Sequence, residues 1–267
     1  MSPIIMLDSG AGGLTIFNEI NRIMPRLPVI YCADNEGFPY GPRPQEEVIQ
    51  RVSLCLRTLC EQFQPSLAVI ACNTASTVAL SRVREELPIP VVGVVPAIKT
   101  AANLSENQCI GLLATPGTVQ RQYTDDLIHD FASQCKVIRV GTTELVQIAE
   151  NKLKGIAPDL EKIKSIISPF LEAEKIPDQA VLGCTHFPLL KEELNLCAPE
   201  INWVDSGEAI ARRVLSLLEN QLNGDSPALL HKALFTDPLT SQEAPYDSAL
   251  KSMGFHSVDT LDLPGFR

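Results

Sequence analysis

Long apolar runs and a basic N-terminal start are both missing from this 267-residue chain. No apolar run approaches the roughly 18 residues that a membrane-spanning helix requires. The opening sequence, MSPIIMLDSG, has no basic residue before its short apolar run, so it does not resemble a signal peptide. We therefore expect a soluble, cytoplasmic protein with no membrane partner.

Positive charge is also scarce, with 22 Lys and Arg against 32 Asp and Glu and a formal net charge of −10. Proteins that bind nucleic acid through its phosphates need clustered Lys and Arg, so we expect no nucleic-acid partner. A small anionic substrate is compatible with this charge, because backbone N–H groups at helix starts can bind anions.

The chain has no C-x-x-C pair, although it has eight cysteines, at positions 32, 55, 60, 72, 109, 135, 184 and 197. The usual zinc-ribbon and thioredoxin-like signatures are therefore excluded, and a reducing compartment disfavours disulfides. Most of the cysteines, including Cys55, Cys60 and Cys109, are expected to be small packed hydrophobes.

Histidine is rare as well, with four residues in the chain. Cys184 and His186 could begin a zinc site, but structural zinc needs four ligands, and the other histidines have no cysteine partner nearby in sequence. The glycines of DSGAGGL do not form the G-x-G-x-x-G loop of dinucleotide-binding proteins. We expect neither a metal nor a cofactor.

Short apolar runs alternate with amphipathic stretches along most of the chain. In the clearest amphipathic stretch, residues 44–63, apolar side chains recur at helical spacing behind a proline. This alternation predicts an α/β fold with mainly parallel sheets covered by helices on both faces. Strands are expected at Ile4–Leu7, Val29–Cys32, Leu67–Ala71, Val91–Val94, Ile110–Ala114, Val137–Val140, Val181–Leu182 and Trp203–Val204.

Two sequence motifs each occur twice in the chain, roughly 110 residues apart. AVIACNT (68–74) resembles AVLGCTH (180–186), and LDSGAGGL (7–14) resembles LATPGTVQ (113–120). The repetition predicts two pseudo-symmetric α/β domains with the active site in the cleft between them. We expect residues 1–95 plus 206–267 to form the first domain and residues 96–205 the second. The stretch NGDSPALL, 223–230, reads as a loop.

Three polar motifs follow predicted strands: Asp8-Ser9-Gly10, Cys72-Asn73-Thr74 and Cys184-Thr185-His186. Ligands of open α/β sheets bind beyond the carboxyl ends of the strands. Each motif is expected to precede a helix, whose start favours negative charge and would stabilise a thiolate. Taken one at a time, these residues have simpler explanations, a packed cysteine at position 72 or a helix cap at Asp8.

The pairing of Cys72 with Cys184 favours chemistry over packing. Two equivalent bases on opposite sides of a substrate suit racemisation, in which one removes a proton and the other returns one to the opposite face. A nucleophilic mechanism would need a single cysteine with a base beside it. The carbanion must also be stabilised by fixed donors, and candidates at the strand ends are Ser9, Asn73, Thr74, Thr115, Thr118 and Thr185.

At these residues the sequence resembles the glutamate racemases of the cofactor-independent aspartate/glutamate racemase superfamily. The resemblance extends from Ile4 to about Arg213. The motifs that carry it occur in the same order: DSGAGGL (8–14), PYG (39–41), ACNTAS (71–76), PVVGVVP (90–96), TPGT (115–118), GCTHFPLL (183–190) and VDSG (204–207).

The resemblance implies interconversion of L- and D-glutamate without pyridoxal phosphate or metal, supplying D-glutamate for peptidoglycan. It implies that Cys72 takes the proton of D-glutamate and Cys184 that of L-glutamate, with Asp8 and His186 assisting. Regulation by a cell-wall precursor, as in some relatives, and a homodimer are further expectations. The residues implied to bind substrate are Asp8, Ser9, Tyr40, Gly41, Cys72, Asn73, Thr74, Thr185 and His186.

The sequence departs from the family pattern in two places. ADNEGFPYG stands where the family often has Asp-Thr-Ala before Pro-Tyr-Gly, and CKVIRVGTTE places Glu144 one residue late. Glu144 is thus a candidate helper of Cys184, with a helix-cap or surface role as the alternative. Competing functions are a racemase of aspartate, another amino acid or hydantoin, a one-cysteine malonate decarboxylase, and a non-enzymatic two-domain binding protein.

Overall fold

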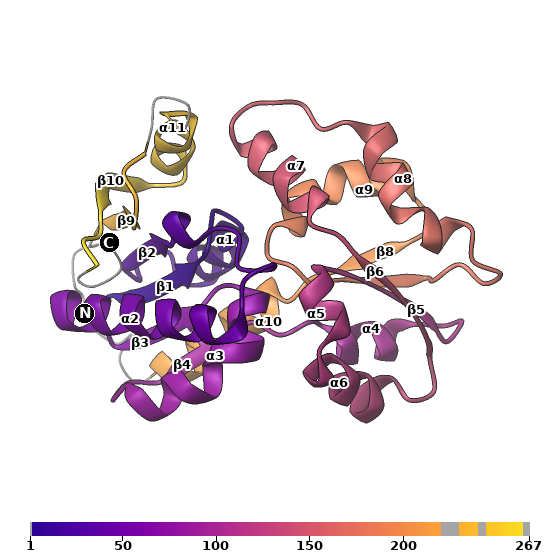
Figure 1. Ribbon diagram of the computed structural model, residues 1–267, viewed down its shortest axis with the longest axis horizontal. Coiled ribbons are helices and arrows are strands. Elements are labelled where there is room, and N and C mark those ends of the chain that lie inside the picture. The colour runs from indigo at the N-terminus through magenta and orange to yellow at the C-terminus, as the bar shows by residue number, and fades with distance from the viewer. Residues whose placement is uncertain (1, 220–229, 240–243, 264–267) are drawn as a thin grey trace. The chain divides into compact units, whose positions relative to one another are not determined.

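The computed structural model describes residues 2–219, 230–239 and 244–263 (Figure 1). The chain forms two compact units, one made of Met1–Val94 with Gly207–Arg267 and the other of Val95–Ser206. Each unit contains one sheet whose strand pairs are all parallel, flanked by helices. The predicted α/β class with mainly parallel sheets is confirmed.

The sheet of the first unit has the order β10-β9-β2-β1-β3-β4. The first strands are continuous apolar runs and are buried throughout, as expected for a sheet covered on both faces. The strands are β1 (Ile4–Asp8), β2 (Val29–Ala33), β3 (Leu67–Ile70), β4 (Val91–Gly93), β9 (His231–Phe235) and β10 (Phe255–Thr260).

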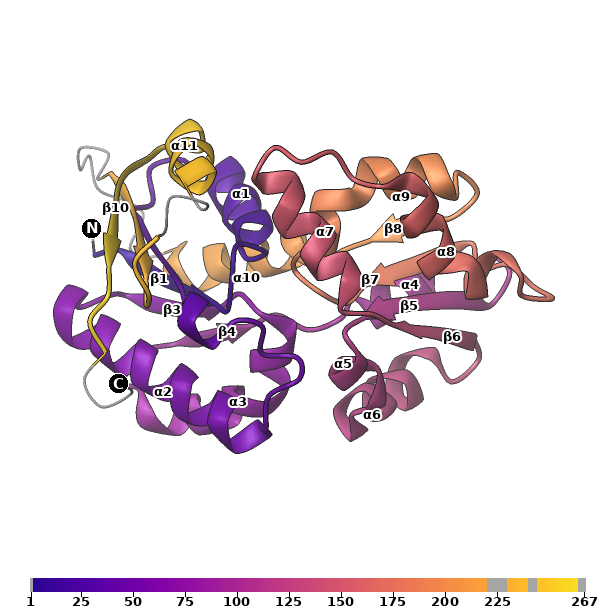
Figure 2. The same ribbon diagram turned by 45° about the horizontal axis from the view of Figure 1, so that its top comes forward.

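The helices of the first unit lie on both sides of this sheet. One face is covered by α2 and α3, which pack together, and the other by α1 and α10 (Figures 1 and 2). Val48, Val52, Leu56 and Leu59 lie on the buried side of α2, which begins after Pro44 as predicted. The helices are α1 (Leu14–Ile23), η1 (Asn35–Gly37), α2 (Gln45–Phe63), α3 (Asn73–Glu86), α10 (Gly207–Leu218) and α11 (Ala244–Ser252).

The sheet of the second unit has the order β6-β5-β7-β8. Its strands are β5 (Cys109–Ala114), β6 (Lys136–Gly141), β7 (Gln179–Leu182) and β8 (Asn202–Val204). Helices α4 to α6 lie on one face and α7 to α9 on the other (Figure 1). They are α4 (Ile98–Leu104), α5 (Pro116–Gln120), α6 (Gln122–Ala132), α7 (Glu144–Leu153), α8 (Leu160–Leu171), η2 (Phe187–Leu190) and α9 (Lys191–Cys197).

The two units repeat one strand order. In the first, β2-β1-β3-β4 are neighbours in that sequence, and in the second β6-β5-β7-β8 are. The repeated sequence motifs occupy matching places, since LDSGAGGL and LATPGTVQ begin at the last two residues of β1 and β5, while AVIACNT and AVLGCTH begin at the second residue of β3 and β7. The sequence repeat therefore reflects a repeated topology.

The part of the chain after Ser206 contains two strands that were not predicted, β9 and β10. In β10 only Phe255 is fully buried, and β9 opens with the half-buried His231 and Lys232. Neither gives the continuous apolar run that marked the other strands. The stretch 223–230 expected to be a loop lies, apart from Leu230, outside the described residues.

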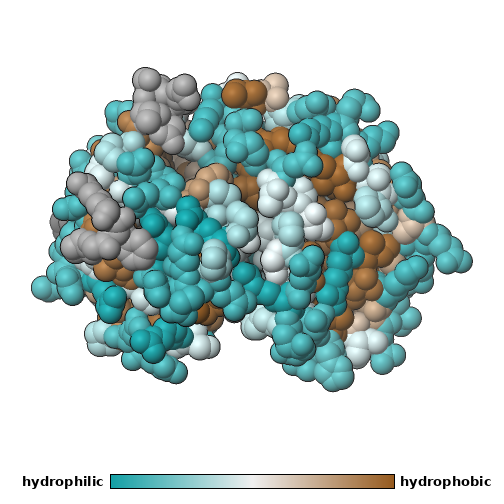
Figure 3. Space-filling model, viewed as in Figure 1, coloured by the Kyte–Doolittle hydropathy of each residue, from teal (hydrophilic) through white to brown (hydrophobic). Residues whose placement is uncertain are grey.

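Hydrophilic side chains dominate the face seen in Figure 3, and apolar patches appear over the second unit. Exposed large hydrophobic residues of that unit include Ile156, Leu160 and Leu196. Within the described residues, no helix has the length and apolar character needed to cross a membrane.

Candidate active site

Each sheet has a point where successive strands switch from one side of the starting strand to the other. In the first unit this point lies between the carboxyl ends of β1 and β3, and in the second between those of β5 and β7. Ligands of open α/β sheets bind at such points. Asp8 and Cys72 stand at the first, and Thr115 and Cys184 at the second.

Asp8 is fully buried at the end of β1. Its two carboxylate oxygens accept hydrogen bonds from the backbone N–H groups of Ser9 and Gly13, each at 2.7 Å. A Cβ on Gly13, the N-cap of α1, would lie 2.8 Å from Cβ of Ala71, so this turn packs closely on the segment leading to Cys72. Asp8 thus orders the turn before α1, as a capping residue would, beside the strand that carries the first cysteine.

Cys72 is the N-cap residue of α3 and is 6% exposed. The free N–H groups at the start of this helix favour a thiolate there. Ser76 fixes the local backbone, because its hydroxyl donates to the carbonyl of Ile70 at 3.1 Å and accepts from the N–H of Val94 at 2.9 Å. The expected position of Cys72 at a helix start is observed.

Asn73, the first residue of α3, has a buried amide whose Nδ2 finds no partner among the described residues. A buried donor left unsatisfied costs about 1–3 kcal/mol. An acceptor atom of a ligand beside Cys72 would remove that cost. Ser9 and Thr74 are also buried at this end of the sheet.

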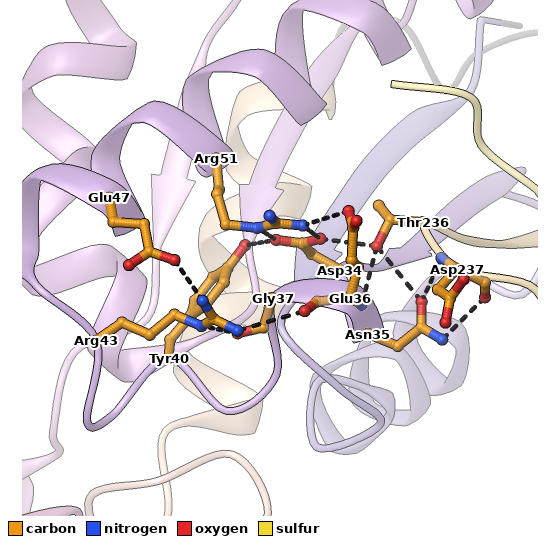
Figure 4. Close-up of polar contacts among 10 residues, drawn as sticks. All are labelled: Asp34, Asn35, Glu36, Gly37, Tyr40, Arg43, Glu47, Arg51, Thr236 and Asp237. Atoms are coloured by element: carbon orange, nitrogen blue, oxygen red, sulfur yellow. Dashed lines mark hydrogen bonds and ion pairs between the residues drawn. The ribbon is translucent and has the colours of Figure 1, made fainter. Parts of the chain in front are cut away.

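Tyr40 is 1% exposed and donates its hydroxyl hydrogen to Oδ2 of Asp34 at 2.5 Å. Burial, with the charge of Asp34 close by, raises the pKa of Tyr40 well above its usual value. Asp34 also accepts two hydrogen bonds from Arg51, both at 2.6 Å (Figure 4). Burial acts to raise the pKa of Asp34, but the hydrogen bonds of Arg51, Tyr40 and Thr236 outweigh it and hold the pKa below its usual value.

The second unit holds a buried line of three polar side chains. Nδ1 of His186 lies 3.8 Å from Sγ of Cys184, and its Nε2 lies 2.6 Å from Oε1 of Glu150. Burial acts to lower the pKa of His186, but its hydrogen bonds to Cys184 and Glu150 raise it well above the usual value. As an imidazolium, His186 donates from both nitrogens, towards Sγ of Cys184 and to Glu150.

The surroundings of Cys184 differ from the expected helix start. The four-residue 3-10 helix η2 begins at Phe187, with His186 as its N-cap, and α9 follows only at Lys191. The proline at position 188 and the short turn keep a regular helix from starting at the cysteine. The stabilising group next to this thiol is therefore the imidazole.

Glu144 does not supply the carboxylate of this line. Its side chain is 57% exposed and forms an ion pair with Lys162 at 2.7 Å, so the surface alternative describes its contacts. The carboxylate on His186 belongs to Glu150, which was not predicted. A signal for it exists in the sequence, since Glu150 shares the buried face of α7 with Val146 and Ala149 at helical spacing.

Two threonines expected to offer hydroxyl donors follow β5 in the second unit. The Oγ1 atoms of Thr115 and Thr118 are 3.0 Å apart, and the hydroxyl of Thr124 donates to the carbonyl of Thr118 at 2.6 Å. Thr185 is buried between Cys184 and His186. The described residues contain no group of three or more His, Cys, Asp or Glu side chains placed to hold a metal ion.

Comparison with known proteins identifies the family of the chain. The family model "Asp/Glu/Hydantoin racemase" matches residues 9–214. The chain belongs to this family. A glutamate racemase of Vibrio vulnificus (strain YJ016) is 48% identical over 97% of this chain and 97% of its own. That of Klebsiella pneumoniae (strain 342) is 46% identical over 97% of this chain and 92% of its own.

Solved structures of the family agree. The crystal structure of Escherichia coli glutamate racemase in complex with L-glutamate and the activator UDP-MurNAc-ala has a TM-score of 0.93 and 43% identity, covering 99% of this chain and 100% of that one. The glutamate racemase isoform RacE1 of Bacillus anthracis has a TM-score of 0.84 and 32% identity over 98% of both chains. These relatives make the protein an amino-acid racemase.

Proposed function

We propose that this racemase interconverts L- and D-glutamate by a cofactor-independent mechanism in which Cys72 and Cys184 are the two bases. One observation carries the proposal. Each unit presents a buried cysteine at its switch point next to a group that stabilises a thiolate, the start of α3 at Cys72 and His186 at Cys184.

The two thiols exchange roles with direction. With D-glutamate, the thiolate of Cys72 takes the Cα proton to form an S–H bond, and the thiol of Cys184 gives its proton to the opposite face of the carbanion. With L-glutamate the order reverses. Each turnover breaks one C–H bond and forms another, and leaves the protonation states of the two cysteines exchanged. The mechanism requires both thiols at one carbon and calls for no cofactor.

Acid–base catalysis by the two thiols accounts for only part of the lowering of the activation barrier. General acid–base catalysis contributes roughly 10²–10⁴-fold per group, so stabilisation of the carbanion by fixed donors must supply the rest. The unsatisfied Nδ2 of Asn73 is such a donor. We propose that the amino and carboxylate groups of the substrate are bound by Asp8, Ser9, Tyr40, Gly41, Asn73, Thr74, Thr185 and His186.

The biological role follows from the product. D-glutamate made in the cytoplasm would enter peptidoglycan synthesis, and the complex of the E. coli relative with UDP-MurNAc-ala supports activation by the same precursor here. A homodimer stays a prediction, which light scattering of the purified protein would test.

The proposed substrate is tested by measuring racemisation in heavy water without added cofactor. Optical rotation and exchange of the α-proton are followed with L- or D-glutamate, and with aspartate as the competing substrate. We expect rotation to be lost from both glutamate enantiomers. Absence of α-proton exchange with either glutamate enantiomer would refute the proposal, and turnover of aspartate alone would favour the alternative substrate.

The two-base mechanism makes a sharper prediction for the single-cysteine variants. Cys72→Ser and Cys184→Ser should each abolish net racemisation. In Cys184→Ser the remaining thiol should still exchange the α-proton of D-glutamate, and in Cys72→Ser that of L-glutamate, because each base reaches one face. Cys60→Ser, at a half-buried position on α2, is the matched control. Near-full racemisation by either active-site variant would contradict the mechanism.

A further inference from the structure

The loop that carries Tyr40 is held by a buried ionic network that includes the segment after β9. Thr236 follows β9, Asp34 follows β2, Asp8 ends β1 and Cys72 follows β3. These strands are neighbours in the order β9-β2-β1-β3, so the four residues form one row along the carboxyl edge of the sheet. The backbone N–H of Asp34 donates to the carbonyl of Asp8 at 2.8 Å.

Asp34 has no accepting capacity left for a substrate. Its Oδ2 accepts from Nε of Arg51 and from the hydroxyl of Tyr40, and its Oδ1 accepts from Nη2 of Arg51 and from the hydroxyl of Thr236 at 2.7 Å (Figure 4). A carboxylate offers about four lone-pair sites, and all are used. Asp34 is therefore neither a base nor a substrate ligand in this geometry.

The segment at Thr236 clamps the residues that lead into the loop. The hydroxyl of Thr236 accepts from the N–H of Glu36 at 3.2 Å while it donates to Asp34. Asn35 and Asp237 exchange two hydrogen bonds, from Asn35 Nδ2 to the Asp237 carbonyl at 2.9 Å and from the Asp237 N–H to Asn35 Oδ1 at 2.8 Å.

The hydroxyl of Tyr40 is also committed. Its single hydrogen goes to Asp34, so it cannot donate to a substrate carboxylate. What the network sets is the position of the Tyr40 backbone and of Gly41 after it. The side chain of Asp34 is linked to the proposed substrate-binding segment through this position.

We propose that Asp34, Arg51 and Thr236 are positioning residues that hold Tyr40 and Gly41 in the conformation that binds glutamate. The inference rests on the proposed function, in which Tyr40 and Gly41 contact the substrate. It adds that the segment after β9 sets the affinity of the site for glutamate, because Thr236 belongs to the network.

The test removes one hydroxyl and keeps the shape of the side chain. Thr236→Val leaves Oδ1 of Asp34 and the N–H of Glu36 each without one partner, so the loop shifts or loosens. We expect KM for both enantiomers to rise about three- to tenfold, as for the loss of one or two hydrogen bonds, with kcat within about twofold. Because the equilibrium constant between enantiomers is one, kcat/KM must fall equally in both directions.

Two further variants separate positioning from general destabilisation. Thr236→Ser keeps the hydroxyl and should restore the wild-type KM. Ser252→Ala removes a hydroxyl bonded within α11 of the same C-terminal segment and should leave KM unchanged. Thermal melting of each variant checks that it is folded.

A double-mutant cycle with Tyr40→Phe completes the test. If both hydroxyls act through Asp34, their effects on KM are coupled. The fold-change in KM of the double variant then differs from the product of the fold-changes of the two single variants. A wild-type KM in Thr236→Val, no rescue by Thr236→Ser, or independent effects in the cycle would each overturn the inference. An inactive wild-type chain would instead overturn the proposed function, and with it the substrate named here.

Discussion

His186 and Glu150 show how a buried charge is maintained at the scale of single residues. Their side chains are 4% and 5% exposed, and the pair is joined at 2.6 Å. Removing one partner of a buried ion pair leaves an uncompensated charge and typically costs 3–5 kcal/mol. Glu150 thus acts to raise the pKa of His186 beside Cys184.

Glu150→Gln should lower the pKa of His186, because it removes a charge that raises it. In the wild type the raised pKa stabilises the folded state fully below the ordinary value of about 6.5, and this contribution is lost as pH rises through the raised value. Titration of the imidazole by NMR measures the shift. Racemisation at neutral pH should fall about tenfold or more, the order expected when a hydrogen bond to a charged group, about 1.5–3 kcal/mol, is weakened.

The matched control is Glu144→Gln on the same helix. Glu144 is exposed and paired with Lys162, and exposed pairs contribute about 0–1 kcal/mol. Neither the titration of His186 nor the activity should change. An unaltered His186 titration in Glu150→Gln would show that another group holds the proton.

The cysteines and His186 were predicted as site residues because they lie in the loops after apolar strands, where the fold class places ligands. Asp34 meets the same criterion after β2 and could have been found by it. Glu150 does not follow a strand: its helical spacing indicates that it is buried, but its contact with His186 depends on how α7 packs against the segment after β7.

At the scale of elements, the short helix η1 is crowded against the buried ion pair. A Cβ added to Gly37 would lie 2.4 Å from both Nε of Arg51 and Oδ2 of Asp34. It would also lie 2.9 Å from Cε1 of Tyr40. Because residue 37 has no side chain, Asp34 and Arg51 can form their ion pair directly next to η1.

Gly37→Ala should therefore destabilise the protein by about 2–3 kcal/mol, the upper part of the range for an overpacked core site, and raise KM. Gly155→Ala is the comparison: its φ of +82° disfavours alanine, but no atom lies within 4 Å of the added Cβ. That variant should lose about 1 kcal/mol and keep its KM. Denaturant unfolding measures both, and a Gly37→Ala protein as stable as Gly155→Ala would contradict the crowding.

Elements differ in how well the sequence predicts them. The eight strands expected up to Val204 are observed within two residues at each end, because most of them read as short, mainly apolar runs, as strands of a covered parallel sheet do. Strand β10 mixes Phe255 with Ser257, Asp259 and other polar residues, since it lies at the edge of its sheet. Strand β9 is an interior strand but opens with His231 and Lys232, so neither β9 nor β10 gave a continuous apolar run, and both were missed for that reason.

At the scale of the whole molecule, the second unit is an insertion within the first. The chain leaves the first unit after Val94 and returns at Gly207. The returning segment supplies β9, which pairs with β2, so β2 is an interior strand only when the C-terminal segment is in place.

A chain ending at Leu230 should lose its first-unit structure, because β2 would become an edge of unpaired backbone groups and Asp34 would lose Thr236. We expect no racemisation and a thermal transition of reduced amplitude by circular dichroism. A truncated chain that turns over glutamate with the wild-type KM would show that the residues after Leu230 are dispensable.

The hydrogen bond between Asp34 and Thr236 joins residues 202 positions apart, and this separation has a consequence in time. At roughly 5–20 residues per second, a ribosome needs about 10–40 s to pass from one to the other. Both cysteines have been synthesised before Thr236 can complete the hydrogen-bond network that positions Tyr40. A nascent chain interrupted after Ser206 thus carries both thiols but not the hydrogen bond of Thr236 to Asp34, and catalytic competence arrives only after the segment at Thr236 has been made.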